Sequence, residues 1–339
     1  MLAGTLVPVT ATAEALRIAT YNTELGRAGP GLLLRDLEEG DPQAKAVARI
    51  VAHARPDVVV LQGIDWDAGG ATLSALSDRI AEAGWPMPHG MAPRPNAGIA
   101  SGRDLDGDGR LGGPGDALGW GRFAGSGGLA LLSRHPIDAG RLRDHTSFRW
   151  ADVPSADPAP SDAGLPVASV GIWVATILAP GGPVDILALH ATPPVFDGPE
   201  DRNGRRNRDE LALVHMLIEA GGPDGPEPPF VVAGDLNLDP QDGEGRHDAL
   251  HRLLASRRIV DPEPIHDAAA PETSGHLGDP RQDTVAWDGP GRLRVDYVLP
   301  SSDWRIGSAG VVWPTPGDDL AGIAETASRH RLVWVDVVR

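Results

Sequence analysis

The stretch that most constrains the fold is an apolar run that ends in Gly234-Asp235-Leu236-Asn237. An apolar run of this length, rich in valine, predicts a buried strand that ends at the edge of a sheet. If the strand geometry persists, the Asp235 and Asn237 side chains leave the same face. A carboxylate there can orient or deprotonate a water, and a carboxamide can hold an oxygen. Asp and Asn also end strands in ordinary turns. Other motifs in the chain are therefore needed to distinguish a catalytic pair from such a turn.

Bulk composition indicates a soluble globular chain. It has 339 residues, 41% of them hydrophobic and 23% charged, enough for one large domain or two small ones. The formal net charge of -17 argues against a tight nonspecific grip on a polyanion, although it allows cutting in a locally positive cleft. Because there is no cysteine, disulfides and thiolate metal sites are excluded.

The N-terminal residues indicate export. Residues 2–13 are apolar or small, and Ala11-Thr12-Ala13 has the small-x-small form of a signal cleavage site. We therefore interpret residues 1–13 as the remnant of an export signal, which predicts a periplasmic or extracellular location. The alternative is a frayed tail. No segment is long and apolar enough to span a bilayer, and the sequence does not indicate an oligomeric state.

The remaining residues, 14–339, are predicted to form a single α/β domain with a long Gly/Pro/Asp-rich loop at about 85–123. Many strands with few helices favour a sheet-on-sheet core with outer helices. The predicted helices span 41–54, 71–83 and 207–220, and the predicted strands span 16–21, 57–61, 128–132, 167–177, 184–190, 292–299, 304–312 and 332–338.

Six short motifs occur in an order typical of one family. They are Thr20-Tyr21-Asn22, Val58-Val59-Val60-Leu61-Gln62, Leu187-Ala188-Leu189-His190, Gly234-Asp235-Leu236-Asn237, Val295-Asp296-Tyr297-Val298 and Ser328-Arg329-His330. In this order the chain resembles the endonuclease/exonuclease/phosphatase superfamily. The resemblance implies an α/β four-layer sandwich of two mixed β-sheets flanked by helices. It also implies hydrolysis of phosphate esters with Mg²⁺ or another divalent metal.

The resemblance also implies roles for the residues that match. Asn22 would lie by the metal, and Asp235 would handle the attacking water with Asn237. His190 would act on the leaving-group side, and Asp296 would pair with His330. The chemistry of the residues agrees, because histidines at strand ends, oriented by carboxylates, can supply acid and base near neutral pH. Taken alone, either histidine would more simply be a strand terminus or a surface residue.

Two departures from the family pattern concern the metal. The family has Glu after Leu-Gln, where this chain has Gly63, and Ser-Asp-His where this chain has Ser328-Arg329-His330. A magnesium site needs hard oxygen ligands, so we assign the ligand role to Asp65, with Asp67 second. Arg329 is predicted to bind a phosphate oxygen of the substrate. The alternatives are a surface arginine or an inactive family member.

Two further clusters predict ligands. Asp104, Asp106 and Asp108, followed by the carbonyl of Arg110 and by Asp116, fit a structural Ca²⁺ loop in spacing, although Gly115 stands at the usual acidic position. The alternative is an unliganded acidic turn. Among the arginines of 202–208, Arg202, Arg205 and Arg206 could recognise phosphate, and the alternative is a salt-bridged helix start.

The combined prediction is an exported, divalent-metal-dependent phosphoesterase acting on a small phosphomonoester or phosphodiester. A secreted nuclease is the alternative, disfavoured by the negative charge and by the lack of an extended basic strip. A non-catalytic binding module with a degenerate metal site is a third hypothesis.

Overall fold

The computed structural model describes residues 15–268 and 275–339, so the predicted export remnant at 1–13 lies outside the described residues. Within these ranges one mixed sheet has six strands: β1 (Leu16–Asn22), β2 (Val58–Ile64), β3 (His89–Met91), β4 (Gly128–Ser133), β12 (Arg305–Val311) and β13 (Val333–Val338). Their order is β12-β13-β1-β2-β4-β3.

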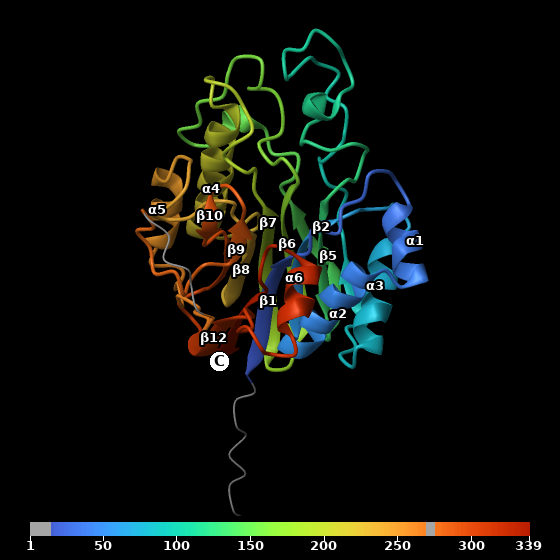
Figure 1. Cartoon of the computed structure of the whole chain (residues 1–339). Coiled ribbons are helices and arrows are strands. Elements are labelled where there is room, and N and C mark those ends of the chain that lie inside the picture. The colour runs from blue at the N-terminus through green and yellow to red at the C-terminus, as the bar shows by residue number, and fades with distance from the viewer. Residues whose placement is uncertain (1–14, 269–274) are drawn as a thin grey trace, which may run out of the picture.

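A second mixed sheet faces the first (Figure 1). Over the same described ranges it contains five strands: β5 (Ile137–Asp144), β6 (Gly171–Ala179), β7 (Gly182–His190), β8 (Phe230–Asp235) and β11 (Asp296–Pro300). Their order is β11-β8-β7-β6-β5, and a small separate hairpin joins β9 (Val285–Trp287) to β10 (Gly291–Leu293).

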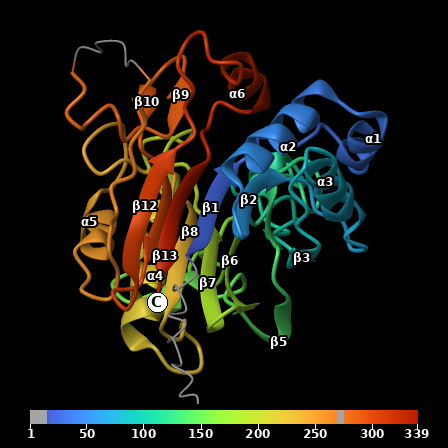
Figure 2. The same ribbon diagram turned by 90° about the horizontal axis from the view of Figure 1, so that it is seen from below.

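Helices cover the outer face of each sheet, which gives four layers. One outer layer is formed by α1 (Leu32–Glu39), α2 (Pro42–Ala54), α3 (Ala71–Glu82) and α6 (Ala321–Ala327), and the other by α4 (Arg202–Ala220) and α5 (Asp248–Leu254). Figure 2 shows α1, α2 and α3 together on the side of β1 and β2, away from α5. A buried apolar core that includes Ile18, Val60, Val231 and Val335 fills the space between the sheets. The predicted α/β four-layer sandwich is therefore confirmed.

Local sequence explains the best-predicted elements. The strand Val58–Ile64 is apolar at nearly every position because both of its faces are covered. Asp41 caps α2 by accepting the Ala44 N–H at 3.0 Å, and Pro42 follows at the first helical position.

Other boundaries differ from the prediction. The strand expected at 292–299 is divided between β10 and β11, and α4 begins at Arg202, five residues before the predicted start at Asn207. The predicted loop at about 85–123 is largely irregular but contains β3 and a short 3₁₀ turn at Pro114–Asp116. Across the described ranges, no helix is long and apolar enough to cross a membrane.

Strand register brings the predicted site residues to one edge. His190 pairs with Asp235 in the parallel β7–β8 ladder, and Asp235 pairs with Asp296 in the antiparallel β8–β11 ladder. On the other sheet Asn22 pairs with Gln62 where β1 and β2 end. Residues paired in register project to the same face, so three polar side chains lie next to one another across three neighbouring strands.

Candidate active site

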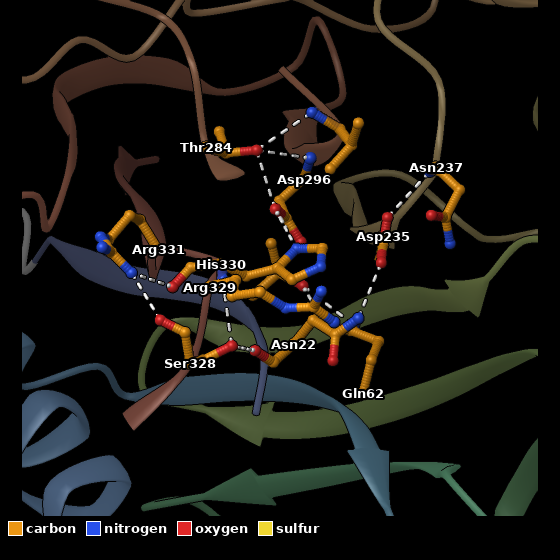
Figure 3. Close-up of polar contacts among 12 residues, drawn as sticks. Asn22, Gln62, Asp235, Asn237, Thr284, Asp296, Ser328, Arg329, His330 and Arg331 are labelled. Atoms are coloured by element: carbon orange, nitrogen blue, oxygen red, sulfur yellow. Dashed lines mark hydrogen bonds and ion pairs between the residues drawn. The ribbon is translucent and has the colours of Figure 1, made fainter. Parts of the chain in front are cut away.

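The centre of the site is Asp235, the last residue of β8, which is fully buried. Its Oδ2 accepts a hydrogen bond of 2.9 Å from Asn22 Nδ2, which joins the ends of the two sheets (Figure 3). The carboxamide of Asn22 is oriented from its other side, because Asn22 Oδ1 accepts the Glu24 N–H at 3.2 Å. Asn22 therefore fixes the position of Asp235 by a contact between strands that are 213 residues apart in the chain.

Asp296 and His330 form a buried ion pair beside Asp235. His330 Nδ1 lies 2.9 Å from Asp296 Oδ2, and the Thr284 hydroxyl donates to the same oxygen at 2.8 Å. Burial would lower the pKa of His330, but the charge and hydrogen bond of Asp296 outweigh it and raise the pKa to about 9. His330 is therefore a cation at neutral pH, and its Nε2 is left for another partner.

His190 has the opposite protonation behaviour. Burial, with the nearby His330 charge, lowers its pKa to about 3, so the imidazole is neutral. Its Nε2 lies 3.7 Å from Asp235 Oδ2, and its Nδ1 has no hydrogen-bond partner among the described residues. A neutral imidazole beside a cationic one is a pair that can accept and donate a proton at the same pH.

Two carboxylates share this buried space. Burial raises the pKa of Asp235, and the neighbouring Asp296 charge raises it further, to about 7. Asp296 Oδ1 is buried and, in the described part of the chain, finds no hydrogen-bond partner. Such a pair is costly without additional positive charge, because neither charge is fully compensated.

These residues fit a divalent metal ion. Asp235 and Asp296 each offer a carboxylate oxygen as a ligand atom, and these oxygens and a ring nitrogen of His330 lie within 4.8 Å of one another. Asp296 Oδ1 has no partner among the described residues, and a bound cation would satisfy this buried oxygen and lower the raised pKa of Asp235. Carboxylate oxygens are the ligands that Mg²⁺ prefers.

Asp65 and Asp67, the ligands predicted from sequence, are not brought into this cluster. The Asp65 carboxylate accepts the N–H groups of Arg27 at 2.8 Å and Gly127 at 2.9 Å, which pins two loops. Asp67 caps the start of α3 by accepting the Thr72 N–H at 2.8 Å, together with two other backbone N–H groups. The reassignment of ligands to these two residues is corrected accordingly, because both carboxylates already serve backbone donors.

The carboxamide of Asn237 also lies differently from the prediction. The strand ends at Asp235, and Asn237 has a left-handed backbone with φ 52°, so the two side chains do not continue one strand face. Asn237 N–H donates to Asp235 Oδ1 at 2.8 Å, and its Nδ2 donates to the Ala191 carbonyl at 2.8 Å. The motif is a side-chain turn that fixes the second oxygen of Asp235.

The predicted phosphate-binding arginines of α4 have structural partners. Arg206 is buried and donates to the carbonyls of Val167, Ala168 and Pro166. Arg202 pairs with Asp162 at 2.9 Å, and Arg205 Nε donates to a backbone carbonyl at 3.3 Å. The structure therefore favours the salt-bridged helix start, and a buried Arg206 is wrong as a substrate contact.

Asn207 is a residue of the site that the sequence analysis placed only at the start of a predicted helix. It is fully buried in α4, and its Nδ2 donates to Thr192 O at 2.7 Å and Leu236 O at 2.8 Å. These carbonyls belong to the segments that follow His190 and Asp235. Asn207 therefore holds the segments that follow β7 and β8, but nothing in its local sequence distinguishes it from a surface asparagine.

The acidic loop at 104–116 is compact. Asp104, Asp106 and Asp116 bring carboxylate oxygens within 4.8 Å of one another, and the Asp108 carboxylate accepts the Arg110 N–H at 2.8 Å. A Cβ on Gly115 would lie 2.2 Å from an Asp106 oxygen, so a side chain at position 115 would displace the Asp106 carboxylate.

Comparison with known proteins agrees with this geometry. Residues 19–330 match the model of the Endonuclease/Exonuclease/phosphatase family, and the chain belongs to that family. A search of curated proteins found no match.

Solved structures share the fold at low sequence identity. The endonuclease/exonuclease/phosphatase from Beutenbergia cavernae is 20% identical with a TM-score of 0.57, over 96% of this chain and 71% of that one. Sphingomyelinase C from Streptomyces griseocarneus is 19% identical with a TM-score of 0.50, over 96% and 100%. A Staphylococcus aureus beta toxin mutant with bound magnesium ions is 13% identical with a TM-score of 0.51, over 96% and 100%.

Proposed function

We propose that this protein is a divalent-metal-dependent phosphoesterase that hydrolyses a small phosphomonoester or phosphodiester. The observation that carries the proposal is the buried cluster at the strand ends, in which two carboxylates lie between a neutral and a cationic histidine. Phosphoester hydrolysis needs a positioned water, a proton donor and acceptor, and positive charge near the phosphoryl oxygens. Membership in a family whose name includes nucleases and phosphatases supports the same chemistry.

We assign each residue one role. Asp235, fixed by Asn22 and by the N–H of Asn237, orients the attacking water. His190 acts on the leaving-group side, where its neutral ring can donate its one N–H as a hydrogen bond to the departing oxygen. His330, held by Asp296, presents a positive charge to the phosphoryl group.

A divalent ion held by Asp235 and Asp296, with the Asn22 amide nearby, would supply Lewis-acid activation of the water or phosphoryl oxygen. The charges of the site and of the whole chain explain why such an ion would be needed. The cluster contributes two carboxylates and one histidine cation to a chain of net charge -17. A phosphate anion would therefore meet little net attraction without an added cation.

A small substrate is favoured over duplex DNA. The arginines of α4, which formed the most basic segment of the sequence, are bound to protein carbonyls and carboxylates. A basic strip that could follow a DNA backbone is therefore not available from that segment. The likeness in fold to a sphingomyelinase makes a phosphodiester a reasonable first substrate to test.

Hydrolysis of p-nitrophenyl phosphate and bis(p-nitrophenyl) phosphate, each with Mg²⁺, Mn²⁺ or EDTA, tests the proposal. We expect turnover of at least one compound with metal, its loss in EDTA, and its loss in His190→Ala. Plasmid nicking that is faster than turnover of either compound would favour the secreted nuclease. If folded protein binds metal but hydrolyses none of these substrates, the non-catalytic binding module becomes the better interpretation.

We also propose that Asp104, Asp106, Asp108 and Asp116, with the Arg110 carbonyl, hold a structural Ca²⁺. The support is the spacing of the loop and the clustering of three of these carboxylates. Such an ion suits a calcium-rich periplasmic or extracellular location, which is part of the proposal.

A further inference from the structure

Arg329 is an exposed arginine whose backbone is fixed at the edge of the site. Its carbonyl accepts the Ala286 N–H at 3.1 Å from the β9 strand, and its own N–H donates to Glu24 Oε2 at 2.7 Å. The next residue is the catalytic His330. In contrast with the buried Arg206 of α4, 63% of the Arg329 side chain is exposed. It can therefore meet a substrate at the rim of the cluster (Figure 3).

Glu24 holds the guanidinium of Arg329. Its Oε1 accepts from Arg329 Nε at 2.8 Å and from Nη2, while Oε2 accepts from the Ser328 hydroxyl at 3.1 Å. Burial would raise the pKa of Glu24, but the hydrogen bonds from Arg329 lower it below its ordinary value. Glu24 is therefore ionised, and its contacts are directed to the segment that carries His330.

The backbone of Glu24 is strained to reach this position. Its φ is 49°, a left-handed conformation that is uncommon for a residue other than glycine. Such strain is concentrated at functional sites. The Glu24 N–H also orients Asn22, so one residue connects Arg329 to the residue that fixes Asp235.

The packing around Gly63 explains why the carboxylate comes from Glu24. A Cβ on Gly63 would lie 2.7 Å from Asn22 Oδ1 and 2.9 Å from the Glu24 nitrogen, and the φ of Gly63 is +70°. A longer side chain therefore does not fit at position 63. At this end of the site the carboxylate that is present belongs to Glu24, and it is committed to a guanidinium.

We propose that the guanidinium of Arg329, held in place by Glu24, forms a fixed subsite for a non-bridging oxygen of the substrate phosphoryl group, with Glu24 as the positioning residue. The inference rests on the proposed phosphoesterase function and deepens it. Glu24 engages Nε and Nη2 of the guanidinium, so Nη1 remains to donate to the phosphate. A guanidinium oriented in advance loses less conformational entropy on binding than a free surface arginine.

The test is binding of inorganic phosphate, measured by calorimetry, in Glu24→Gln, Arg329→Gln and the double variant. Arg329→Gln should weaken phosphate binding about tenfold, because one charge-assisted hydrogen bond is lost. Glu24→Gln should weaken it about threefold by releasing the guanidinium, and should add nothing in the Arg329→Gln background. The matched control is Arg35→Gln, which removes an arginine of 56% side-chain exposure that pairs with Asp36 on α1.

A second readout separates this proposal from the proposed function. If phosphate binding depends on Arg329 while no phosphoester is hydrolysed, the subsite stands and the enzyme assignment falls. If hydrolysis proceeds and neither phosphate affinity nor KM changes in Arg329→Gln, the subsite is wrong. If Glu24→Gln weakens Mn²⁺ binding and leaves phosphate binding unchanged, Glu24 is a metal ligand and the positioning role is overturned.

Discussion

His190 and His330 differ in charge because of their neighbours. His330 Nδ1 meets an Asp296 oxygen at 2.9 Å, whereas His190 lies 3.7 Å from Asp235 and beside a cation. The first arrangement favours the protonated ring and the second disfavours it. At the level of single residues, the difference in protonation between the two histidines thus follows from burial and from which carboxylate is within hydrogen-bond reach.

Alanine at His190 or at Asp235 should lower turnover about a hundredfold or more, since each removes a group that we propose acts on the reacting atoms. Turnover of a chromogenic phosphoester by the purified variants is the measurement. His89→Ala, on β3, is the matched control. Activity near wild type in both site variants would remove the assignment of this cluster as catalytic.

The His330–Asp296 pair should make the metal-free protein less stable at alkaline pH. The pKa of His330 is about 9 in the fold, above the ordinary value of 6.5, so the folded state holds the proton more tightly. This contribution, on the order of 3 kcal/mol, is fully present below about pH 6.5 and is lost as the pH rises through 9. Thermal unfolding in EDTA from pH 6 to 10 should show the loss in wild type and in the exposed control His53→Gln. If stability falls with rising pH just as steeply in His330→Gln, the loss does not come from the His330–Asp296 pair.

Asp65→Asn should lower stability without changing metal dependence. Asparagine presents an amide nitrogen to one of the two N–H donors that Asp65 now accepts, which should cost about 1–3 kcal/mol. The metal concentration for half-maximal rate should stay at the wild-type value in Asp65→Asn and rise in Asp296→Asn. A shift in Asp65→Asn alone would restore the ligand role that its sequence position suggested.

At the scale of secondary-structure elements, strands and one helix bring the site residues together. Strand ends bring His190, Asp235 and Asp296 into register, and α4 ties the segments after two of those strands through Asn207. Because Asn207 donates from a helix to two loop carbonyls, it couples the position of α4 to the geometry of the candidate site.

Asn207→Ala should therefore lower both stability and turnover. Two buried carbonyls, of Thr192 and Leu236, would lose their donor, at a cost of about 1–3 kcal/mol. Asn203→Ala is the control, because Asn203 lies on the same helix and donates to the Val195 carbonyl at 2.7 Å. Urea unfolding and turnover are the measurements. Equal effects of the two substitutions on turnover would mean that Asn207 has no special positioning role.

The sequence predicted those elements and residues that are determined locally. The apolar run before Asp235 marks a buried strand and its end, and Asp41 followed by Pro42 marks a helix start. The structural role of the Asp65 carboxylate could not be predicted in this way, because its hydrogen-bond donors, the N–H groups of Arg27 and Gly127, lie 38 and 62 residues away in the chain. For Arg206, likewise, the carbonyl acceptors belong to a loop about 40 residues earlier.

On the scale of the whole molecule, the sandwich places its long loops outside the four layers. The loop that contains residues 104–116 extends beyond the end of the sheets (Figure 1). Its aspartates are bonded mainly to N–H groups of the loop itself, such as the 2.8 Å bond from Gly107 to Asp104. Little apolar packing is available there, so an ion is a physically reasonable source of order.

Calcium should therefore stabilise the protein through this loop. A ligand that binds only the native state raises its stability by an amount that grows with ligand concentration, about 2.7 kcal/mol at a hundred times Kd. Wild type should melt a few degrees higher in millimolar calcium than in chelator, and the triple change of Asp104, Asp106 and Asp108 to Asn should abolish the difference. Asp318→Asn, which alters an exposed aspartate that also accepts a backbone N–H, should keep it. Calorimetry is the measurement. Equal melting temperatures of wild type in calcium and in chelator would leave the loop as an acidic turn without an ion.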